Sequence, residues 1–364
     1  MPFLGPSRSV PALGPCRSRR GPSRRGRAVR SFGALLGACV LLAGGLAACG
    51  GGGGERITVY SGRNPELIGP LLERFARRTG ISVDVRYGES TDLALLLAEE
   101  GDRSPADVFI SQSPGAMGYV DGRGRLRPLP EAILQRVPER FRATDGDWVG
   151  LSGRVRVLVY NRNRLTVSEL PRSVFELTEA RWRGRVGIAP TNASFQDFVT
   201  ALRELVGDDR TRGFLEGLRA NGAQIYANNV AIVEAVGRGE VDVGLVNHYY
   251  NERAKSEDPG VASENHLFAP GDPGSLILVT AAGVLRSSRS PGPAERLVSF
   301  LLSRPAQSFF ARETFEYPLA AGVRPAVRDL PQLEDIASPK VDLSSLGDEL
   351  ARTRRMIQRA GLEG

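Results

Sequence analysis

Two adjacent tyrosines are the residues whose type and spacing point most directly to chemistry. Tyr249 and Tyr250 close the stretch Asn247-His248-Tyr249-Tyr250, which follows a predicted strand over residues 241–245. A phenol titrates near 10 in water, but a hard, highly charged cation such as ferric iron displaces its proton and gains a strong oxygen ligand. Consecutive strand residues point to opposite faces, so both phenols reach one ion only from a turn or from the first turn of a helix. The structural alternative is that one ring packs in the core and the other lies at its rim.

Small polar side chains stand at two further element ends. Pro190-Thr191-Asn192-Ala193-Ser194 follows a predicted strand at 186–188, and Tyr226-Ala227-Asn228-Asn229 precedes a predicted helix at 231–236. Ligands of open α/β sheets gather at the carboxyl ends of strands. Helix N-termini with small polar caps present free backbone N–H groups to an anion. The pattern therefore predicts an anion site near the two phenols.

Composition removes several functional classes. Residues 1–48 hold eight of the 48 basic residues and no acidic one. The rest of the chain then has 40 basic residues against 41 acidic residues, so its composition does not indicate a basic surface that binds nucleic acid. All three cysteines, Cys16, Cys39 and Cys49, precede residue 50, which excludes disulfides, thiolate metal sites and cysteine nucleophiles from the body of the chain. Two histidines cannot build a three-histidine zinc site. The sequence also lacks a G-x-S-x-G elbow, an HExxH motif and a Walker motif.

The start of the chain is typical of an exported lipoprotein. A basic stretch ends at Arg30, and an apolar run over residues 32–48 leads into Leu46-Ala47-Ala48-Cys49, which resembles the bacterial lipobox. The resemblance implies a signal peptide over residues 1–48 and lipidation of Cys49, which would attach the protein to the outer face of the cell membrane. Residues 49–55 then form a glycine-rich tether. The alternative is an uncleaved membrane anchor.

Strands and helices alternate in the rest of the chain. Strand patterns at 56–60, 83–87 and 107–110 are separated by helical patterns that end at Gly80 and Gly101. This order predicts a parallel sheet with helices on its faces. Asn64-Pro65 suits an N-cap and first helical position, while Pro70 falls inside the pattern and predicts a distorted or later first turn.

The same alternation returns after residue 155, and we expect an α/β fold of two lobes. Each lobe is predicted to be a mainly parallel sheet flanked by helices and joined to the other by hinge strands near residues 151–157 and 276–284. The predicted boundaries are lobe 1 over residues 56–152 and 278–325, lobe 2 over 153–277, and a C-terminal helical segment over 326–364 that packs on one lobe.

From Ile57 onward the chain resembles the ferric-ion-binding proteins of bacterial ABC import systems. The matching segments, in the family's order and spacing, are Ile57-Thr58-Val59-Tyr60-Ser61-Gly62, Ser104-Pro105-Ala106-Asp107-Val108-Phe109, Leu151-Ser152-Gly153-Arg154, Val157-Leu158-Val159-Tyr160, Trp182-Arg183-Gly184-Arg185-Val186-Gly187, Pro190-Thr191, Asn247-His248-Tyr249-Tyr250 and Glu316-Tyr317-Pro318-Leu319. The resemblance implies a two-lobed type II periplasmic-binding-protein fold that closes on its ligand by hinge motion. It also implies a monomeric, non-enzymatic binding protein that delivers ferric iron to the permease and ATPase subunits of an importer.

The resemblance also implies a set of site residues. In this family paired tyrosines bind Fe(III), which carries over to Tyr249 and Tyr250, and phosphate or carbonate binds at helix N-termini as a synergistic anion. The matching anion positions are Asn192, Ala193, Asn229 and Asn247, of which Asn192 and Ala193 stand where the family has serine and glycine.

The first lobe departs from the family pattern. One branch supplies a histidine and a glutamate to the metal, and the corresponding places hold Asn64 and Gln112; another branch adds a tyrosine near Phe195, which has no donor atom. Neutral amides are weak ligands for ferric iron. We therefore expect water, the anion or a chelator to complete the coordination sphere, with Asn64 and Gln112 forming hydrogen bonds from the facing lobe.

Other polar residues keep two interpretations. Tyr226 either supports the site from behind or packs, and His248 either touches the ligand or does not. For three arginines we expect solvated or ion-paired side chains rather than contact with an anionic chelator: Arg63, Arg154 and Arg156. Binding of another solute, such as an iron chelate, a thiamine-like molecule or a polyamine, is the alternative function, and a secreted hydrolase is the more distant one, since fold alone does not decide.

Overall fold

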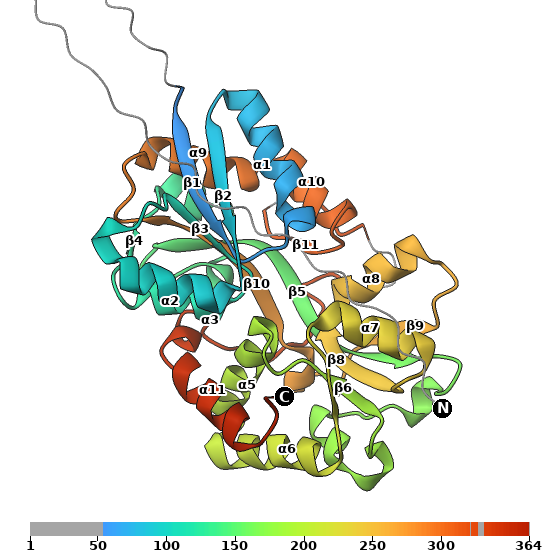
Figure 1. The fold of residues 1–364 in the computed structure, drawn as a ribbon. Coiled ribbons are helices and arrows are strands. Elements are labelled where there is room, and N and C mark those ends of the chain that lie inside the picture. Colours follow the sequence, from blue (N-terminus) through green and yellow to red (C-terminus); the bar gives the residue numbers. More distant parts are fainter. Residues whose placement is uncertain (1–53, 321, 327–330, 364) are drawn as a thin grey trace, which may run out of the picture. The chain divides into compact units, whose positions relative to one another are not determined.

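The computed structural model describes residues 54–320, 322–326 and 331–363 (Figure 1). The predicted signal peptide over residues 1–48, the lipobox cysteine Cys49 and the first residues of the predicted tether lie outside the described residues. Within the described ranges no helix is both long and apolar enough to cross a bilayer.

The first sheet has a parallel core. Strand β1 (Arg56–Ser61) lies between β2 (Ser82–Tyr87) and β3 (Val108–Ser111), and both neighbours run parallel to it. Helices α1 (Pro65–Thr79) and α2 (Ser90–Glu100) make the two crossovers. The predicted strand–helix order and the parallel pairing are therefore confirmed for this part of the chain.

Two long strands follow β3 in the sheet order and run antiparallel to their neighbours. They are β10 (Ile277–Leu285) and β5 (Trp148–Asn161), and β4 (Leu126–Arg127) and β11 (Tyr317–Pro318) pair with them at the margin. Because these strands oppose the parallel core, the sheet is mixed. Strand β5 is buried along its whole length and covers the predicted crossing near residues 151–157.

The second sheet begins on the far half of β5. Residues 156–160 of β5 pair with β8, and the order continues through parallel neighbours to the short β7. The remaining strands of this sheet are β8 (Val243–Asn247), β6 (Val186–Ile188), β7 (Gln224–Ile225) and β9 (Ser263–His266). One strand thus belongs to both sheets, which suits it to act as a hinge.

The remaining helices lie on the faces of these sheets (Figure 1). They are α3 (Pro114–Asp121), α4 (Glu131–Leu134), α5 (Ala193–Val206), α6 (Asp208–Ala220), α7 (Asn229–Arg238), α8 (His248–Glu257), α9 (Pro291–Leu301), α10 (Arg304–Arg312) and α11 (Leu350–Arg359). Helix α7 continues past Gly237 and ends at Gly239, whose left-handed conformation (φ 72°) closes it.

Helix α1 corrects one expectation. It begins at Pro65 and continues through Pro70, so its first turn does not start later. Pro70 lies so near the N-terminus that its missing N–H removes only one early helical bond. A buried stripe holds the helix on the sheet despite that loss: Leu67, Ile68, Leu71, Leu72 and Phe75.

The C-terminal segment contacts helices that belong to each of the two sheets. Leu343 and Leu346 are buried in the core of the first sheet, whereas Ile357 and Leu362 are buried in the core of the second. The 3₁₀ turn at Ser345–Gly347 packs on α3, and α11 packs on α5. The sequence led us to expect packing on one lobe; the described contacts involve helices from both sides of the predicted division.

A buried ion pair lies where the hinge strands meet. The guanidinium of Arg63 donates to both carboxylate oxygens of Glu316, at 2.7 and 2.6 Å, and both side chains are fully buried. Ser152 on β5 and Thr314 donate to the same carboxylate at 3.1 and 2.8 Å. Arg63 is therefore ion-paired, one of the two states that the sequence led us to expect, and its partner comes from a segment far away in the sequence.

Replacing Glu316 tests this pair. We expect Glu316→Gln to lower the free energy of unfolding by about 3–5 kcal/mol at neutral pH, since it leaves a buried guanidinium without its counter-charge. Urea unfolding measures the loss. Glu73→Gln is the control, because Glu73 pairs with Arg77 in solvent, and it should change stability by less than about 1 kcal/mol.

The same pair predicts a pH dependence. Burial raises the pKa of Glu316, but Arg63 and Thr314 outweigh burial and hold it below 4.5. A lowered pKa means that the stabilisation is present above the unfolded-state value and is lost as pH falls through the native one. The difference between wild type and Glu316→Gln should therefore shrink in acid; a difference that is constant from pH 7 to pH about 3 would contradict it.

Candidate functional site

The two tyrosines lie where β8 becomes α8. Asn247 ends the strand, the helix begins at His248, and both tyrosines fall in its first turn. Their rings stack with centroids 4.2 Å apart, and Tyr249 and Tyr250 are 0% and 8% exposed. Both tyrosines lie in the first turn of a helix, one of the two positions that the sequence predicted for them, so their side chains leave the alternation of the strand.

Both phenol oxygens converge on one atom from the other sheet. The amide nitrogen Nε2 of Gln112 donates to Tyr249 Oη at 2.7 Å and to Tyr250 Oη at 3.0 Å. Gln112 directly follows β3 of the first sheet, whereas the tyrosines follow β8 of the second. A single cation at the position of this nitrogen would reach both oxygens.

The backbone of Gln112 is fixed on both sides. Its N–H donates to Ser90 Oγ at 2.9 Å, and its carbonyl accepts a hydrogen bond from the guanidinium of Arg154. Arg154 lies on the hinge strand β5 and is fully buried, as is Arg156 two residues later. The expectation of solvated or ion-paired side chains is therefore wrong for these two arginines: both are buried, and the hydrogen bonds described for them go to backbone carbonyls and a threonine hydroxyl. The available signal was two arginines at i and i+2 in an apolar strand, which share one face.

Burial keeps the phenol of Tyr249 protonated. Desolvation raises its pKa well above 10, with smaller contributions in the same direction from Tyr250 and Glu316, while Arg63 and Arg154 lower it. The arginines therefore reduce, without removing, the penalty for forming a phenolate. A metal that binds here must displace the protons of both phenols.

The predicted anion residues gather at the starts of α5 and α7. Asn192 caps α5 by accepting from Ser194 N at 3.1 Å, and Asn229 Nδ2 donates to Asn192 Oδ1 at 3.1 Å. Asn247 Nδ2 donates to Ser194 Oγ at 3.1 Å. Ala193 is the first residue of α5. The structure thus brings all four residues to one place.

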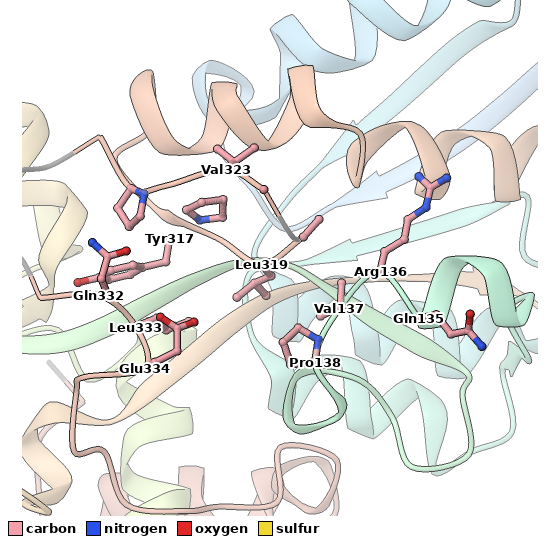
Figure 2. A pocket seen from close by; sticks show the side chains of 14 residues that line it. Gln135, Arg136, Val137, Pro138, Tyr317, Leu319, Val323, Gln332, Leu333 and Glu334 are labelled. Carbon is pink, nitrogen blue, oxygen red and sulfur yellow. The ribbon is translucent and has the colours of Figure 1, made fainter.

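A cavity of about 400 Å³ opens beside these residues. Its walls include Asn192, Ala193 and Gln196 of the second sheet's side, Thr91 at the start of α2, and Arg354 of α11. Three carboxylates, Glu89, Asp92 and Glu363, line the cavity as well. Its volume is sufficient for a small anion or a carboxylate chelator, although acidic side chains outnumber the arginine in its walls. A separate cavity of about 490 Å³ lies between residues 135–138 and the segment that starts at Tyr317 (Figure 2), and neither phenol of the pair lines it.

The other two expected contacts have no described hydrogen bond to the phenols. Asn64 occupies the N-cap position of α1, is exposed, and makes no side-chain capping hydrogen bond. Tyr226 packs its ring on Gly187, where an added Cβ would lie 3.1 Å from the ring, so it has the packing role of its two interpretations. Of the three residues, Gln112 is the one with described hydrogen bonds to the phenol pair.

His248 supports the hinge instead of a ligand. Its Nδ1 accepts from Val155 N at 3.2 Å, and its Nε2 lies 2.9 Å from the carbonyl oxygen of Phe315, to which it donates as the neutral tautomer. Burial lowers the pKa of His248 to about 4, with backbone hydrogen bonds acting in the opposite direction. Phe315 has a left-handed backbone (φ 56°), so this bond holds a strained residue next to Glu316.

A second group of possible metal ligands consists of carboxylates alone. Asp121, Asp145 and Asp147 bring oxygens within 4.8 Å of one another near the end of α3. Burial and the two neighbouring aspartates raise the pKa of Asp121 to about 7. A proton shared between Asp121 and Asp147 accounts for this closeness without an ion.

The chain is similar in sequence to known bacterial proteins. The sequence profile of bacterial extracellular solute-binding proteins matches residues 103–341. The Fe(3+)-binding periplasmic protein of Serratia marcescens is 32% identical over 332 residues, which cover 90% of this chain and 96% of that protein. The major ferric iron-binding protein of Neisseria meningitidis serogroup A is 35% identical over 318 residues, 84% of this chain and 93% of that protein.

Solved structures of iron-bound proteins also superpose on this chain. Iron-bound HitA from Pseudomonas aeruginosa superposes with a TM-score of 0.81 at 34% identity, over 85% of this chain and 100% of that one. Trichodesmium FutA in complex with iron and citrate ligands superposes with a TM-score of 0.70 at 27% identity, over 85% and 100% of the two chains.

Titration of the metal-free protein tests the phenol environment. We expect Tyr249 and Tyr317 to stay protonated well above pH 10, because burial raises the pKa of both phenols. Ultraviolet absorbance of phenolate, followed as pH rises, detects the late ionisation. Tyr249→Phe should remove one of these two late-ionising phenols, whereas Tyr119→Phe should leave the late transition at its full amplitude. If every tyrosine ionises near pH 10 while the chain is still folded, the described environment is wrong.

Proposed function

Because this chain belongs to the bacterial extracellular solute-binding protein family, we propose that it is the extracytoplasmic component of an ABC importer that captures ferric iron. Its fold is the type II periplasmic-binding-protein fold that the sequence predicted. In this proposal the iron is held between two lobes and handed to a permease with its ATPase subunits. The family is one of solute-binding proteins, and the proposal contains no catalytic step.

One observation carries the proposal: two phenol oxygens converge within 3.0 Å of a single nitrogen. Paired phenolates suit a hard trivalent cation, since each cancels one charge and offers an oxygen ligand. A polyamine or thiamine-like cation would need acidic walls. The charged residues that act on Tyr249 are Arg63, Arg154 and Glu316, two of which are positive, so the immediate surroundings of this phenol disfavour an organic cation. The neighbouring cavity does have acidic walls, so this effect applies to the phenol alone.

The coordination sphere needs more than the phenolates. Gln112 must move from the point between the two oxygens when iron takes its place. We propose that phosphate or carbonate, held by Asn192, Ala193, Asn229 and Asn247 at the helix starts, supplies further oxygen ligands. The cavity beside them is large enough for a carboxylate chelator as well, and the FutA structure with iron and citrate offers a precedent in another protein.

The proposal also states where in the cell the protein is located. Cys49 is lipidated and anchors the chain to the outer face of the cell membrane, with residues 49–55 as the tether. The lobes are residues 56–152 with 278–325, and residues 153–277. The shared strand β5 supports this division, since its two halves pair in different sheets.

Phenylalanine variants test the ligands. Fe(III) added with phosphate to wild type should produce a visible phenolate-to-iron charge-transfer band. Tyr249→Phe and Tyr250→Phe should each weaken that band and reduce iron affinity by more than about 100-fold, because loss of a ligand exceeds the loss of an outer partner. Tyr160→Phe, in the second core, should change neither. The proposal fails if both paired variants retain band and affinity.

A carboxylate in place of Gln112 tests the neutral amide. Gln112→Glu should increase iron affinity by at least about tenfold, measured by competition with citrate, since an anionic oxygen is a better ligand for a hard cation than an amide. Gln224→Glu on the exposed strand β7 adds the same charge away from the site and should leave affinity unchanged. Unaltered or weaker binding by a folded Gln112→Glu protein would contradict this role.

Lipidation has a direct assay. Expression in cells fed radioactive fatty acid should label the wild-type protein and leave Cys49→Ser unlabelled, because Cys16 and Cys39 lie outside the lipobox. Cys39→Ser serves as the control and should label normally. Labelling of the Cys49→Ser protein would refute the anchor.

A further inference from the structure

A buried carboxylate joins the two sheets close to the tyrosine pair. Asp197 lies on α5 of the second sheet's side and is 1% exposed. Its Oδ1 accepts from Ser113 Oγ at 2.7 Å and from the backbone N–H of Gly115 at 3.3 Å. Ser113 and Gly115 begin α3, which follows β3 of the first sheet. Asp197 therefore reaches across to the N-terminus of a helix that belongs to the other half.

The start of α3 is shaped for this carboxylate. A Cβ on Gly115 would lie 2.5 Å from Asp197 Oδ1, so only glycine permits the approach. Ser113 Oγ also accepts from Ala116 N at 2.9 Å and so connects the carboxylate to the first turn. An anion at a helix N-terminus is favoured by the free N–H groups and by the helix dipole.

The contact between Asp197 and the start of α3 can break and form again. The second oxygen of Asp197, Oδ2, has no hydrogen-bond partner among the described residues. Burial raises the pKa of Asp197 to about 6, while Ser113, Arg154, Gly115 and Arg156 act against burial. A buried carboxylate with no ion-pair partner within bonding distance gains much less than a packed apolar contact would. It can therefore separate from α3 when the halves open.

The contact also sets the position of Gln112. Gln112 precedes Ser113, and its amide meets both phenols. When a cation replaces that amide, the bonds between Gln112 and the phenols are lost, whereas the bonds from Ser113 and Gly115 to Asp197 involve neither phenol. Of these interactions across the halves, only the one at Asp197 survives cargo binding unchanged.

We propose that Asp197 is a positioning residue that holds α3 against the second half and so raises the closed fraction of the protein, with or without cargo. Its consequence for iron rests on the proposed function. The apparent dissociation constant equals the intrinsic one divided by the closed fraction, so weakening this contact weakens binding without changing a ligand.

Three variants test the contact from both sides. Asp197→Ala removes the acceptor, Ser113→Ala removes one donor, and Gly115→Ala blocks the approach. Gly292→Ala is the matched control, because Gly292 also follows the proline that begins a helix and an added Cβ there meets nothing within 4 Å. Asp197→Asn keeps an acceptor oxygen, so it should weaken the contact less than Asp197→Ala does.

Small-angle scattering of the purified protein gives the first readout. Without metal, the three variants should be more extended than wild type and Gly292→Ala. With Fe(III) and phosphate they should become compact again, with affinity reduced about tenfold, the equivalent of one charge-assisted hydrogen bond. The charge-transfer band should keep its wavelength, since the ligands are unchanged. A merely structural role would lower the melting temperature without this iron-dependent compaction.

A double variant gives the second readout. In Asp197→Ala the oxygen that Gly115→Ala would meet is gone, so adding Gly115→Ala should have little further effect on affinity or on metal-free scattering. Fully additive effects would overturn the contact. If Asp197→Ala fails to fold, Ser113→Ala and Gly115→Ala still test the contact, because each of them alters it from the half that carries α3.

The two proposals fail in different ways. If wild type binds no iron while the metal-free variants are extended, the proposed function is wrong and the role of Asp197 stands. If wild type binds iron but all three variants match Gly292→Ala in scattering and affinity, the role of Asp197 is wrong and the proposed function stands.

Discussion

Two hydrogen bonds from one amide nitrogen to two phenol oxygens connect the halves of this protein at its candidate site. The bonds exist because Gln112 ends one strand of the first sheet while Tyr249 and Tyr250 begin a helix after a strand of the second. At this strand-to-helix junction the alternation of side chains between opposite faces ends, and the two consecutive tyrosines reach one point. The shared strand β5 brings these two strand ends together, and the cap cluster of α5 lies beside them.

Charge around the phenols explains how such a site can both take and release a trivalent ion. Three buried arginines, Arg63, Arg154 and Arg156, act on the pair, with Glu316 and Asp197 as the buried carboxylates near them. Burial keeps the phenol of Tyr249 neutral when no cation is present, while Arg63 and Arg154 act in the opposite direction on its pKa. Protons and metal thus compete for the same oxygens, and the positive surroundings favour an anionic co-ligand over a bare cation.

Local patterns were enough to predict the elements and part of the site. Strand alternation, glycine helix ends and small polar caps lie within a few residues of the features that they predict, so the parallel cores and the tyrosine-bearing helix start were foreseeable. The burial of Arg63 was not, because its partner Glu316 is 253 residues away. Asp197 and Ser113 are 84 residues apart and meet only through the shared strand. Asn64 was expected at the site by position in the family pattern, but its side chain is exposed at the N-cap position of α1 and makes no capping hydrogen bond.

Anomalous diffraction at the iron edge, from crystals exposed to Fe(III) and phosphate, tests the central claim most directly. The account predicts one strong peak between Tyr249 Oη and Tyr250 Oη, with the Gln112 amide displaced from that point. Iron bound instead at the carboxylates of Asp121, Asp145 and Asp147, with both Gln112–phenol hydrogen bonds intact, would contradict it.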